Sequence, residues 1–211
     1  MIFLLAALII SYFLGSIPTA YLFGKVLKGI DIRQVGSGNV GATNAFRVLG
    51  KGPGTCVLLI DIAKGALALT LVGDHFHLEG FFPRAALGIA AVVGHNWTCF
   101  LQFKGGKGIA TTLGVLIGLA IHFPHFQSVL LASVSVWLIC FLASGYVSLS
   151  SMVAAVILPI TMLITNQGFP VVILGVIFCL FVILRHRPNI RRLISGQESR
   201  VPLFFHKKPR R

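Results

Sequence analysis

Acidic residues are scarce in this chain of 211 residues, which has five Asp and Glu against eighteen Lys and Arg. Charged residues of both signs make up 11% of the sequence, whereas 56% is hydrophobic and the mean hydropathy is +0.91. This composition excludes a soluble globular protein and is typical of a bilayer protein. A net charge of +13 would suit nucleic acid only on a water-facing surface, and the basic residues are not distributed in that way, so we expect no nucleic-acid partner.

Cysteines are also few, and none is in a CxxC pair. They lie in or beside apolar stretches, which predicts core residues and neither a disulfide framework nor a zinc site. The four are Cys56, Cys99, Cys140 and Cys179.

Seven apolar stretches follow one another along the chain, at 1–23, 54–73, 84–100, 109–121, 126–143, 150–165 and 169–184. The first lacks a basic start and is long enough to span, so we expect a transmembrane helix there and not a cleaved signal. The stretch 109–121 would cover only about 20 Å, so a half-span or re-entrant segment is the alternative there. The prediction is an all-α, polytopic membrane helix bundle of about seven transmembrane helices, with a range of five to seven.

The basic residues are placed asymmetrically. With seven alternating spans, sixteen of the eighteen fall on one side, the exceptions being Lys64 and Arg84. Because Lys and Arg are retained in the cytoplasm, we expect the N-terminus outside and the C-terminus cytoplasmic. Residues 1–211 then form a single integral-membrane domain, in which 185–211 is a cytoplasmic interfacial segment and basic tail. For tail residues such as Lys207, topology and attraction to anionic lipid suffice as an explanation.

The first basic loop, 35–52, reads VGSGNVGATNAFRVLGKG. Gly36, Gly38 and Gly41 permit positive φ, so that successive N–H groups can form a nest for an anion. The spacing matches neither GxxxxGK[ST] nor GxGxxG, and a tight loop with Asn caps is the structural alternative. Its candidate ligand groups are Ser37, Asn39, Thr43, Asn44 and Arg47.

The second basic loop, 94–112, reads GHNWTCFLQFKGGKGIATT and becomes apolar at Ile109. A glycine turn that enters a helix directs N–H groups and the positive end of the helix dipole at one point. A lysine there makes this a better anion site than the first loop, although a short turn with one inside-facing lysine is the simpler alternative. His95 and Trp97 could close the site, or they could serve as packing and anchoring residues. The turn itself is Lys104, Gly105, Gly106, Lys107 and Gly108.

The third segment, 185–200, reads RHRPNIRRLISGQESR. Pro188 can start an interfacial helix that carries Asn189, and Gly196 can end it. His186 titrates near neutrality, so it can donate to a phosphate or act as a base. A histidine that reaches the membrane surface among arginines is the structural alternative.

Two further polar features lie in or between the apolar stretches. Asp61 and Lys64 are three residues apart, so they would share a helix face and neutralise each other, as a structural pair or as a catalytic one. In 144–151 the hydroxyls of Ser144 and Ser148 are weak site candidates, and helix caps are favoured.

Three basic or glycine-rich segments on one membrane face imply a ligand with more than one anionic group. A phospholipid-building reaction fits. The chain has no GxSxG elbow, HxxxxD pair, HExxH motif or carboxylate cluster for Mg²⁺, which favours a reaction that needs little enzyme-borne nucleophile. An organic-phosphate transporter predicts ligands near the bilayer midplane, whereas most basic residues here lie at one face. A basic lipid-binding scaffold would leave both glycine-rich loops without a purpose.

Three segments resemble the signature motifs of the bacterial acyl-phosphate:glycerol-3-phosphate acyltransferase family. They are GSGNVGATN at 36–44, GHNWTCFLQFKGGKGIAT at 94–111 and HRPNIRRLISGQESR at 186–200. The segments GSIPTAYLFGK, GIDIRQ and LIDIAKG also resemble that family, so the resemblance covers nearly the whole chain in order. One departure is Thr98, where the family usually has proline. It affects the local turn more than the chemistry.

The resemblance implies a bacterial inner-membrane enzyme with a cytoplasmic active site. Such an enzyme moves a fatty acyl group from acyl phosphate to the sn-1 hydroxyl of glycerol 3-phosphate, which gives lysophosphatidic acid and phosphate without a metal or cofactor. Its partners would be these two substrates, membrane lipid and a peripheral enzyme that supplies acyl phosphate. The catalytic residues implied are Ser37, Lys107, His186 and Asn189. The binding residues implied are Ser37, Asn44, Arg47, Lys107, His186 and Asn189, with backbone donors from Gly105, Gly106 and Gly108. The loop sequences themselves add Gly38, Asn39, Lys104 and Ser144 as candidate binding residues.

Overall fold

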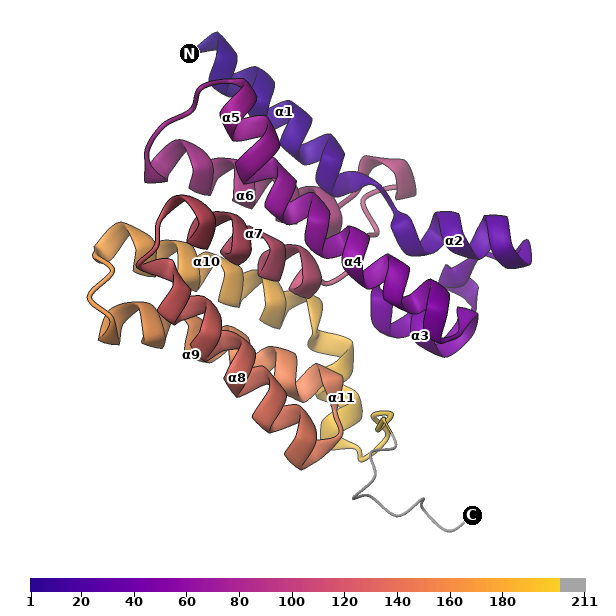
Figure 1. The fold of residues 1–211 in the computed structure, drawn as a ribbon. Helices are drawn as coiled ribbons and strands as arrows, with labels where there is room; N and C mark the ends of the chain where they lie inside the picture. Colours follow the sequence, from indigo (N-terminus) through magenta and orange to yellow (C-terminus); the bar gives the residue numbers. More distant parts are fainter. Residues whose placement is uncertain (202–211) are drawn as a thin grey trace. The chain divides into compact units, whose positions relative to one another are not determined.

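The computed structural model describes residues 1–201, and every regular element in that range is a helix (Figure 1). The all-α prediction is therefore confirmed. The chain divides into two compact units, Met1–Phe126 and Gln127–Arg211. The last ten residues of the expected tail, including Lys207, lie outside the described residues.

The first unit contains seven α-helices, two 3₁₀ turns and one π turn within its described residues. In chain order they are α1 (Ile2–Ser16), α2 (Thr19–Lys28), η1 (Ile32–Gln34), α3 (Ala42–Leu49), α4 (Lys51–Leu67), η2 (Ala68–Val72), α5 (Gly73–His75), α6 (Phe81–Asn96), η3 (Cys99–Leu101) and α7 (Ile109–His122).

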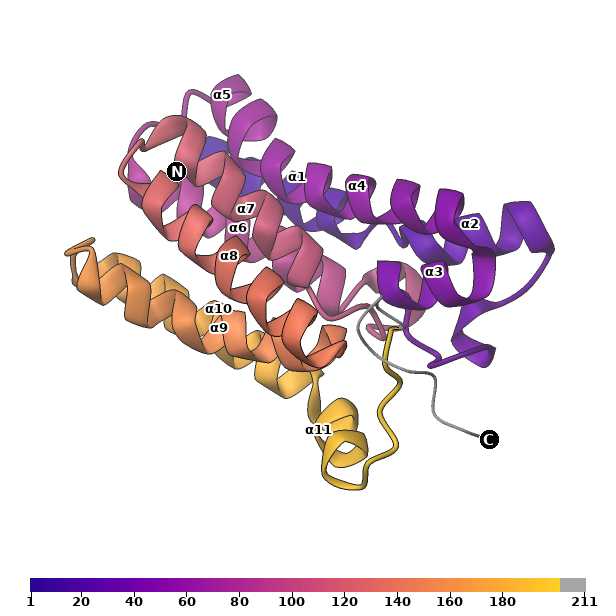
Figure 2. The same cartoon turned by 60° about the horizontal axis from the view of Figure 1, so that its bottom comes forward.

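The second unit is built from four helices in the part of the chain that the structure describes. They are α8 (Phe126–Ser144), α9 (Val147–Ile164), α10 (Phe169–Arg185) and α11 (Arg187–Ile194). Helices α9 and α10 pack along each other (Figure 2), and the Trp137 indole N–H on α8 donates to Ser151 Oγ on α9 at 3.2 Å. Pro188 lies in the first turn of α11 and Gly196 follows its end with φ +69°, so the expected bounds of this helix are confirmed.

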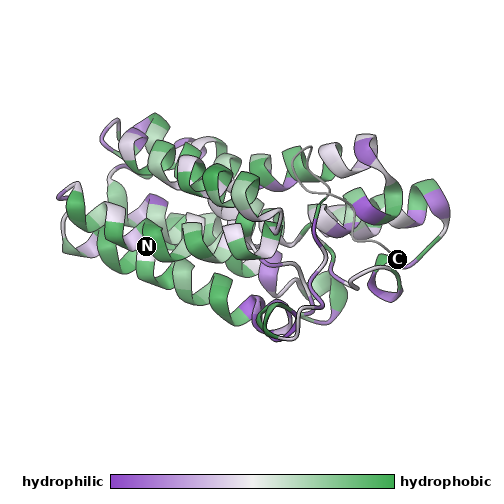
Figure 3. Cartoon of the chain, turned by 90° about the horizontal axis from the view of Figure 1, so that it is seen from below, coloured by the Kyte–Doolittle hydropathy of each residue, from purple (hydrophilic) through white to green (hydrophobic). Residues whose placement is uncertain are grey.

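Four helical segments in residues 1–201 are long and apolar enough to cross a membrane: Ile2–Lys28, Lys51–His75, Phe126–Ser144 and Val147–Ile164. A fifth arises if α10 and α11, which meet at a bend of 60°, are counted as one span. The predicted stretches at 84–100 and 109–121 form α6, with 16 residues, and α7, with 14. Hydrophobic colour covers most of the long helices, and hydrophilic colour gathers at loops and short helices (Figure 3).

The first predicted span is interrupted at Ile17 and Pro18, between α1 and α2. Proline has no N–H and its ring prevents the preceding turn from closing, so helical hydrogen bonding stops there. Two carbonyl oxygens at the break accept side chains from other helices. Ser16 O accepts from Thr98 Oγ1 at 2.6 Å, and Ile17 O accepts from Lys64 Nζ at 3.0 Å.

Glycines allow the helices of the first unit to approach backbone to backbone. A Cβ added to Gly94 of α6 would lie 2.1 Å from Tyr12 O of α1, and one on Gly114 of α7 would lie 1.9 Å from Ile62 O of α4. Small residues at such crossings are typical of packing in a bilayer, where apolar lipid removes the hydrophobic drive for association. These crossings fix α6 and α7, which lead into and out of the second basic loop.

A buried arginine lies by the π turn that interrupts the long segment from α4 to α5. Arg84 Nη1 donates to Leu69 O, and its Nη2 forms an ion pair with Asp74 at 2.6 Å. The π turn leaves carbonyl groups displaced from the α-helical pattern, and the guanidinium satisfies one of them. His122 Nε2 lies 2.9 Å from Arg84 Nη1. Lys64 and Arg84, the two exceptions to the basic face, are therefore each held by an aspartate.

Candidate active site

Asn44 organises the first basic loop from inside the protein. Its Oδ1 accepts the Ser37 N–H at 2.9 Å, and its Nδ2 donates to Ile32 O and Val35 O at 3.2 and 3.0 Å. The side chain is almost completely buried, so it is a support for the loop. This is the Asn-capped arrangement that the sequence left open, and it leaves the Ser37 side chain exposed at the surface of the loop.

Two of the three loop glycines adopt the predicted positive φ. Gly36 has φ +66° and Gly38 has φ +71°. Gly41, the N-cap of α3, instead has φ −111°. A Cβ on Gly41 would lie 2.9 Å from Asn39 Oδ1, which shows that glycine serves close approach at this position. Arg47 is exposed on α3, within this segment.

A bidentate ion pair precedes the loop. Arg33 donates to Asp31 through Nε and Nη2, with the shortest contact at 2.7 Å, and the guanidinium lies over the Tyr21 ring at 5.3 Å. Hydrogen bonds from the Arg33 side chain lower the pKa of Asp31 to about 2. The carboxylate therefore stays ionised at neutral pH and fixes the chain just before Ser37.

The second basic loop enters α7 as predicted, with Gly108 as the N-cap at φ +78°. The Gly105 N–H donates to Asn96 O at 3.1 Å and the Gly106 N–H to His95 O at 2.9 Å. These two N–H groups thus already bind main-chain acceptors, a use that differs from the expected donation to substrate. The N–H groups of residues 109–111, in the first turn of α7, have no intrahelical acceptor. Lys107 is half-buried and Lys104 is exposed.

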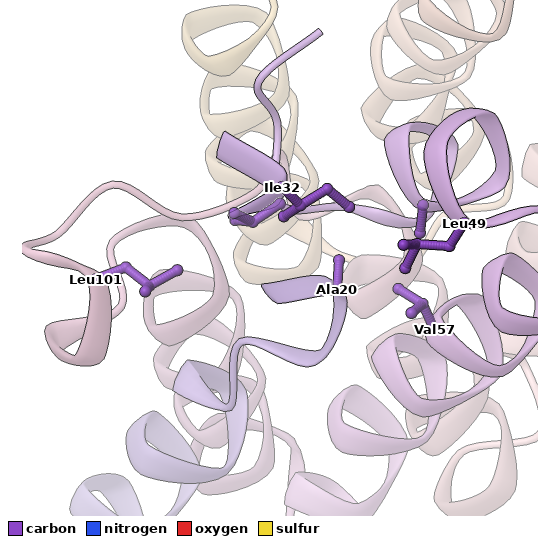
Figure 4. Close-up of a cluster of buried hydrophobic side chains, with 7 residues drawn as sticks. Ala20, Ile32, Leu49, Val57 and Leu101 are labelled. Atoms are coloured by element: carbon purple, nitrogen blue, oxygen red, sulfur yellow. The ribbon is translucent and has the colours of Figure 1, made fainter. Parts of the chain in front are cut away.

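Both loops rest on one hydrophobic core in the first unit. Ile32, next to the first loop, and Leu101, within the second, belong to a cluster that also includes Ala20, Leu49 and Val57 (Figure 4). Each is less than a tenth exposed. The first two basic segments therefore lie against the same core in this unit.

Asp61 is the centre of a buried polar cluster beside this core. Its Oδ1 lies 2.9 Å from Lys64 Nζ and accepts from Thr19 Oγ1 at 3.1 Å. The predicted Asp61–Lys64 pair is confirmed. His95 Nδ1 lies 3.8 Å from the same oxygen, so the imidazole faces the carboxylate at a distance too long for a hydrogen bond. Sequence reasoning missed Thr19 because it is 42 residues from Asp61.

His186 and Asn189 lie at the bend between α10 and α11 in the second unit. Both are buried, at 2% and 4% exposure. His186 Nδ1 lies 2.8 Å from Val182 O. Because a carbonyl only accepts, Nδ1 must carry a proton, and the neutral imidazole then has its lone pair on Nε2. The histidine is thus oriented by a main-chain carbonyl, in place of the carboxylate that many histidine bases use.

Glu198 joins three donors next to this bend. Its Oε1 accepts from Ser148 Oγ at 2.7 Å and from Asn189 Nδ2 at 2.6 Å, and its Oε2 accepts from Arg192 Nε at 2.7 Å. Burial opposes ionisation, but the hydrogen bonds from Arg192, Ser148 and Asn189 outweigh it and lower the pKa of this carboxyl. Sequence reasoning missed Glu198. The signal available was one carboxylate in a segment rich in arginine.

Ser144 acts as a helix cap, as favoured from the sequence. Its hydroxyl donates to Cys140 O at 2.7 Å and accepts the Tyr146 N–H at 3.2 Å. Both bonds are local, at the turn between α8 and α9.

Comparisons with known proteins agree with these motifs. The family described as Glycerol-3-phosphate acyltransferase matches residues 5–196. A Glycerol-3-phosphate acyltransferase of Pelodictyon phaeoclathratiforme is 43% identical, over 95% of this chain and 97% of its own length. One of Prochlorococcus marinus is 46% identical, over 92% and 95%.

Two crystal structures of PlsY, an integral membrane glycerol 3-phosphate acyltransferase, are similar to this chain. The glycerol 3-phosphate form is 39% identical with a TM-score of 0.85 and covers 94% of this chain and 96% of that one. The lysophosphatidic acid form is 38% identical with a TM-score of 0.81, over 94% and 95%. With a family match over most of its length and the three motifs in order, this multi-pass membrane chain belongs to the glycerol-3-phosphate acyltransferase family.

Proposed function

We propose that this enzyme transfers a fatty acyl group from acyl phosphate to the sn-1 hydroxyl of glycerol 3-phosphate, which yields lysophosphatidic acid and inorganic phosphate. The observation that carries the proposal is the glycine turn that brings Lys107 to the N-terminus of α7, in a chain that matches the family over residues 5–196. A cation beside a helix N-terminus is suited to a phosphate.

Both substrates carry a phosphate, and the proposed roles divide accordingly. Lys107 and Arg47 hold the charge of glycerol 3-phosphate, through an ammonium and a planar guanidinium respectively. Ser37, His186 and Asn189 contact the acyl phosphate. Asn44 and Asn39 shape the first loop, Gly38 supplies its positive φ, and Lys104 adds positive charge. Gly105, Gly106 and Gly108 give the second loop its close backbone path.

The reaction needs little activation by the protein because acyl phosphate is a mixed anhydride. The glycerol hydroxyl attacks the acyl carbonyl, the new ester C–O bond forms, and the bond to phosphate breaks. The hydroxyl proton goes to a phosphate oxygen of the donor, which leaves as inorganic phosphate. His186 Nε2 is the alternative acceptor, because Nδ1 is held by Val182 O.

The side-chain contacts support direct transfer without an acyl-enzyme. The Ser144 hydroxyl donates to a main-chain carbonyl, and Ser148 donates to Glu198. The Glu198 carboxylate already accepts hydrogen bonds from Ser148, Asn189 and Arg192, so it is poorly placed to take the proton of the glycerol hydroxyl.

The proposed enzyme lies in the bacterial inner membrane with its N-terminus outside, about seven crossings, and a cytoplasmic active site. This orientation follows from the basic residues that gather on one side. Acyl phosphate would come from a peripheral enzyme at the same surface.

The test is turnover by the purified protein in detergent or lipid, without added metal. Labelled glycerol 3-phosphate is offered with palmitoyl phosphate or with palmitoyl-CoA. Lysophosphatidic acid from palmitoyl phosphate alone is the expected result. Product from palmitoyl-CoA alone would overturn the donor and the substrate-assisted step, and no product from either would overturn the proposed reaction.

A further inference from the structure

His95 packs against the glycine turn of the second basic loop. The Gly106 N–H donates to its main-chain oxygen at 2.9 Å. A Cβ placed on Gly106 would lie 2.1 Å from His95 Nε2, and one on Gly105 would lie 2.1 Å from His95 O. The imidazole and the main-chain oxygen of this residue therefore both lie against the loop that presents Lys107.

The other edge of the imidazole faces Asp61. His95 is 7% exposed, and its Nδ1 lies 3.8 Å from Asp61 Oδ1. The same carboxylate oxygen is fixed by Lys64 Nζ at 2.9 Å and by Thr19 Oγ1 at 3.1 Å. Asp61, at 1% exposure, is thus held from α4 and α2 while it faces a ring on α6.

We propose that Asp61 is a positioning residue for the phosphate loop and acts through His95. Its carboxylate holds the imidazole against Gly106, and the imidazole keeps residues 105–108 in the conformation that presents Lys107. The inference rests on the proposed function only in the assignment of this loop to glycerol 3-phosphate. The contacts from Asp61 to Gly106 are independent of that assignment.

A purely structural role for Asp61 makes a different prediction. A buried ion pair that loses one partner destabilises the whole fold, because the remaining charge is unpaired. Such a loss would lower stability without a selective effect on one substrate. The Asp74–Arg84 pair offers a control, since it is an ion pair of the same unit with a 2.6 Å contact and lies by the π turn.

The first experiment is a double-mutant cycle between His95 and Gly106. Gly106→Ala should impair glycerol 3-phosphate binding strongly in the wild-type background and much less in His95→Ala, because the added methyl then meets no ring. Gly105→Ala is the matched control. Its methyl meets the main-chain oxygen of His95, so its effect should be the same in both backgrounds. Equal effects of Gly106→Ala in the two backgrounds would overturn the contact.

The second experiment compares Asp61→Asn with Asp74→Asn by steady-state kinetics. We expect Asp61→Asn to raise KM for glycerol 3-phosphate about tenfold or more, as for residues coupled within one network, with a smaller change in kcat. Asp74→Asn should leave that KM unchanged. If Asp61→Asn alone does not fold, the double variant Asp61→Asn, Lys64→Met removes both charges together and serves in its place. If the increase in KM is proportional to the loss of thermal stability, and to the same degree in both variants, the positioning role is refuted.

A third measurement does not depend on enzyme activity. Hydrogen exchange of peptides that cover Gly105 and Gly106 should be faster in Asp61→Asn than in wild type and unchanged in Asp74→Asn, because both N–H groups bind carbonyls of His95 and Asn96. If this difference appears while no lysophosphatidic acid is formed, the proposed function fails and the positioning contact stands. If Asp61→Asn protein still forms lysophosphatidic acid and hydrogen exchange at Gly105 and Gly106 is unchanged, the positioning role is overturned.

Discussion

Ser148 and Asn189, from helices α9 and α11, donate to the same carboxylate oxygen, Oε1 of Glu198, at 2.7 and 2.6 Å. One acceptor therefore sets the orientation of both side chains. Arg192 holds the other oxygen of that carboxylate, so the group cannot rotate without loss of an ion pair. This contact connects the end of α11 to the start of α9 and fixes the Asn189 amide, for which we propose a contact with acyl phosphate.

Ionised Glu198 should stabilise the second unit at neutral pH, and this stabilisation should be lost in acid. Its folded-state pKa lies below the ordinary value of 4.5, so the stabilisation is fully present above pH 4.5 and is lost as pH falls through the lower folded value. Glu198→Gln should lower the melting temperature at pH 7, and the difference from wild type should shrink below pH 4.5. Thermal unfolding of both proteins from pH 7 to pH 3 measures this, and a constant difference would contradict it.

Removal of the Lys107 ammonium should reduce kcat/KM strongly. A hydrogen bond between charged groups contributes about 1.5–3 kcal/mol, so Lys107→Ala should lose roughly ten- to a hundredfold in kcat/KM for glycerol 3-phosphate. Lys207→Ala, in the basic tail, is the control and should remain close to wild type. Equal losses in the two variants would show that general positive charge, and not this loop, attracts the substrate.

The substitution His186→Gln tests which group accepts the hydroxyl proton, a phosphate oxygen of the acyl donor or His186 Nε2. If the phosphate of the donor takes the proton, the variant should show a raised KM for acyl phosphate and retain measurable kcat. Loss of a general base would instead lower kcat by about 10²–10⁴-fold. Initial rates at saturating acyl phosphate decide between these outcomes, with far-ultraviolet circular dichroism to establish that the variant is folded.

Thr98 should tolerate the proline that is usual at this position in the family. Its φ is −67°, which lies at the value that proline imposes. Its hydroxyl adds a 2.6 Å hydrogen bond to Ser16 O, which proline would lose. We expect Thr98→Pro to fold and to keep most of its activity, and Thr98→Val to lose about 1 kcal/mol of stability from the same missing bond. Failure of Thr98→Pro to fold would show that the turn itself differs from the family turn.

Features that depend on neighbouring residues could be predicted from the sequence. The helix that includes Pro188 and ends before Gly196, the entry of the glycine turn into α7, and the Asp61–Lys64 pair all follow from spacing within a few residues, and all are confirmed. The interruption at Ile17 also had a local signal in Pro18, which the apolar composition of the stretch concealed.

Features that depend on distant residues could not be predicted. Ser148 and Glu198 are 50 residues apart, and no local pattern indicates that they meet. The use of the Gly105 and Gly106 N–H groups depends on where His95 and Asn96 end α6. A glycine-rich sequence shows that the backbone can approach something closely, but not whether that partner is a ligand or the protein itself.

We expect Pro18 and Lys64 to be kept together or lost together in related sequences. The interruption next to Pro18 provides the Ile17 carbonyl that accepts the Lys64 ammonium. A substitution that allowed α1 to continue into α2 would engage this oxygen in the helix and leave the ammonium with Asp61 alone. Related sequences that lack the proline should therefore replace Lys64 and Asp61 together by uncharged residues, because either charge left alone would be buried and unpaired. The two positions would be inherited together although they lie 46 residues apart in the chain.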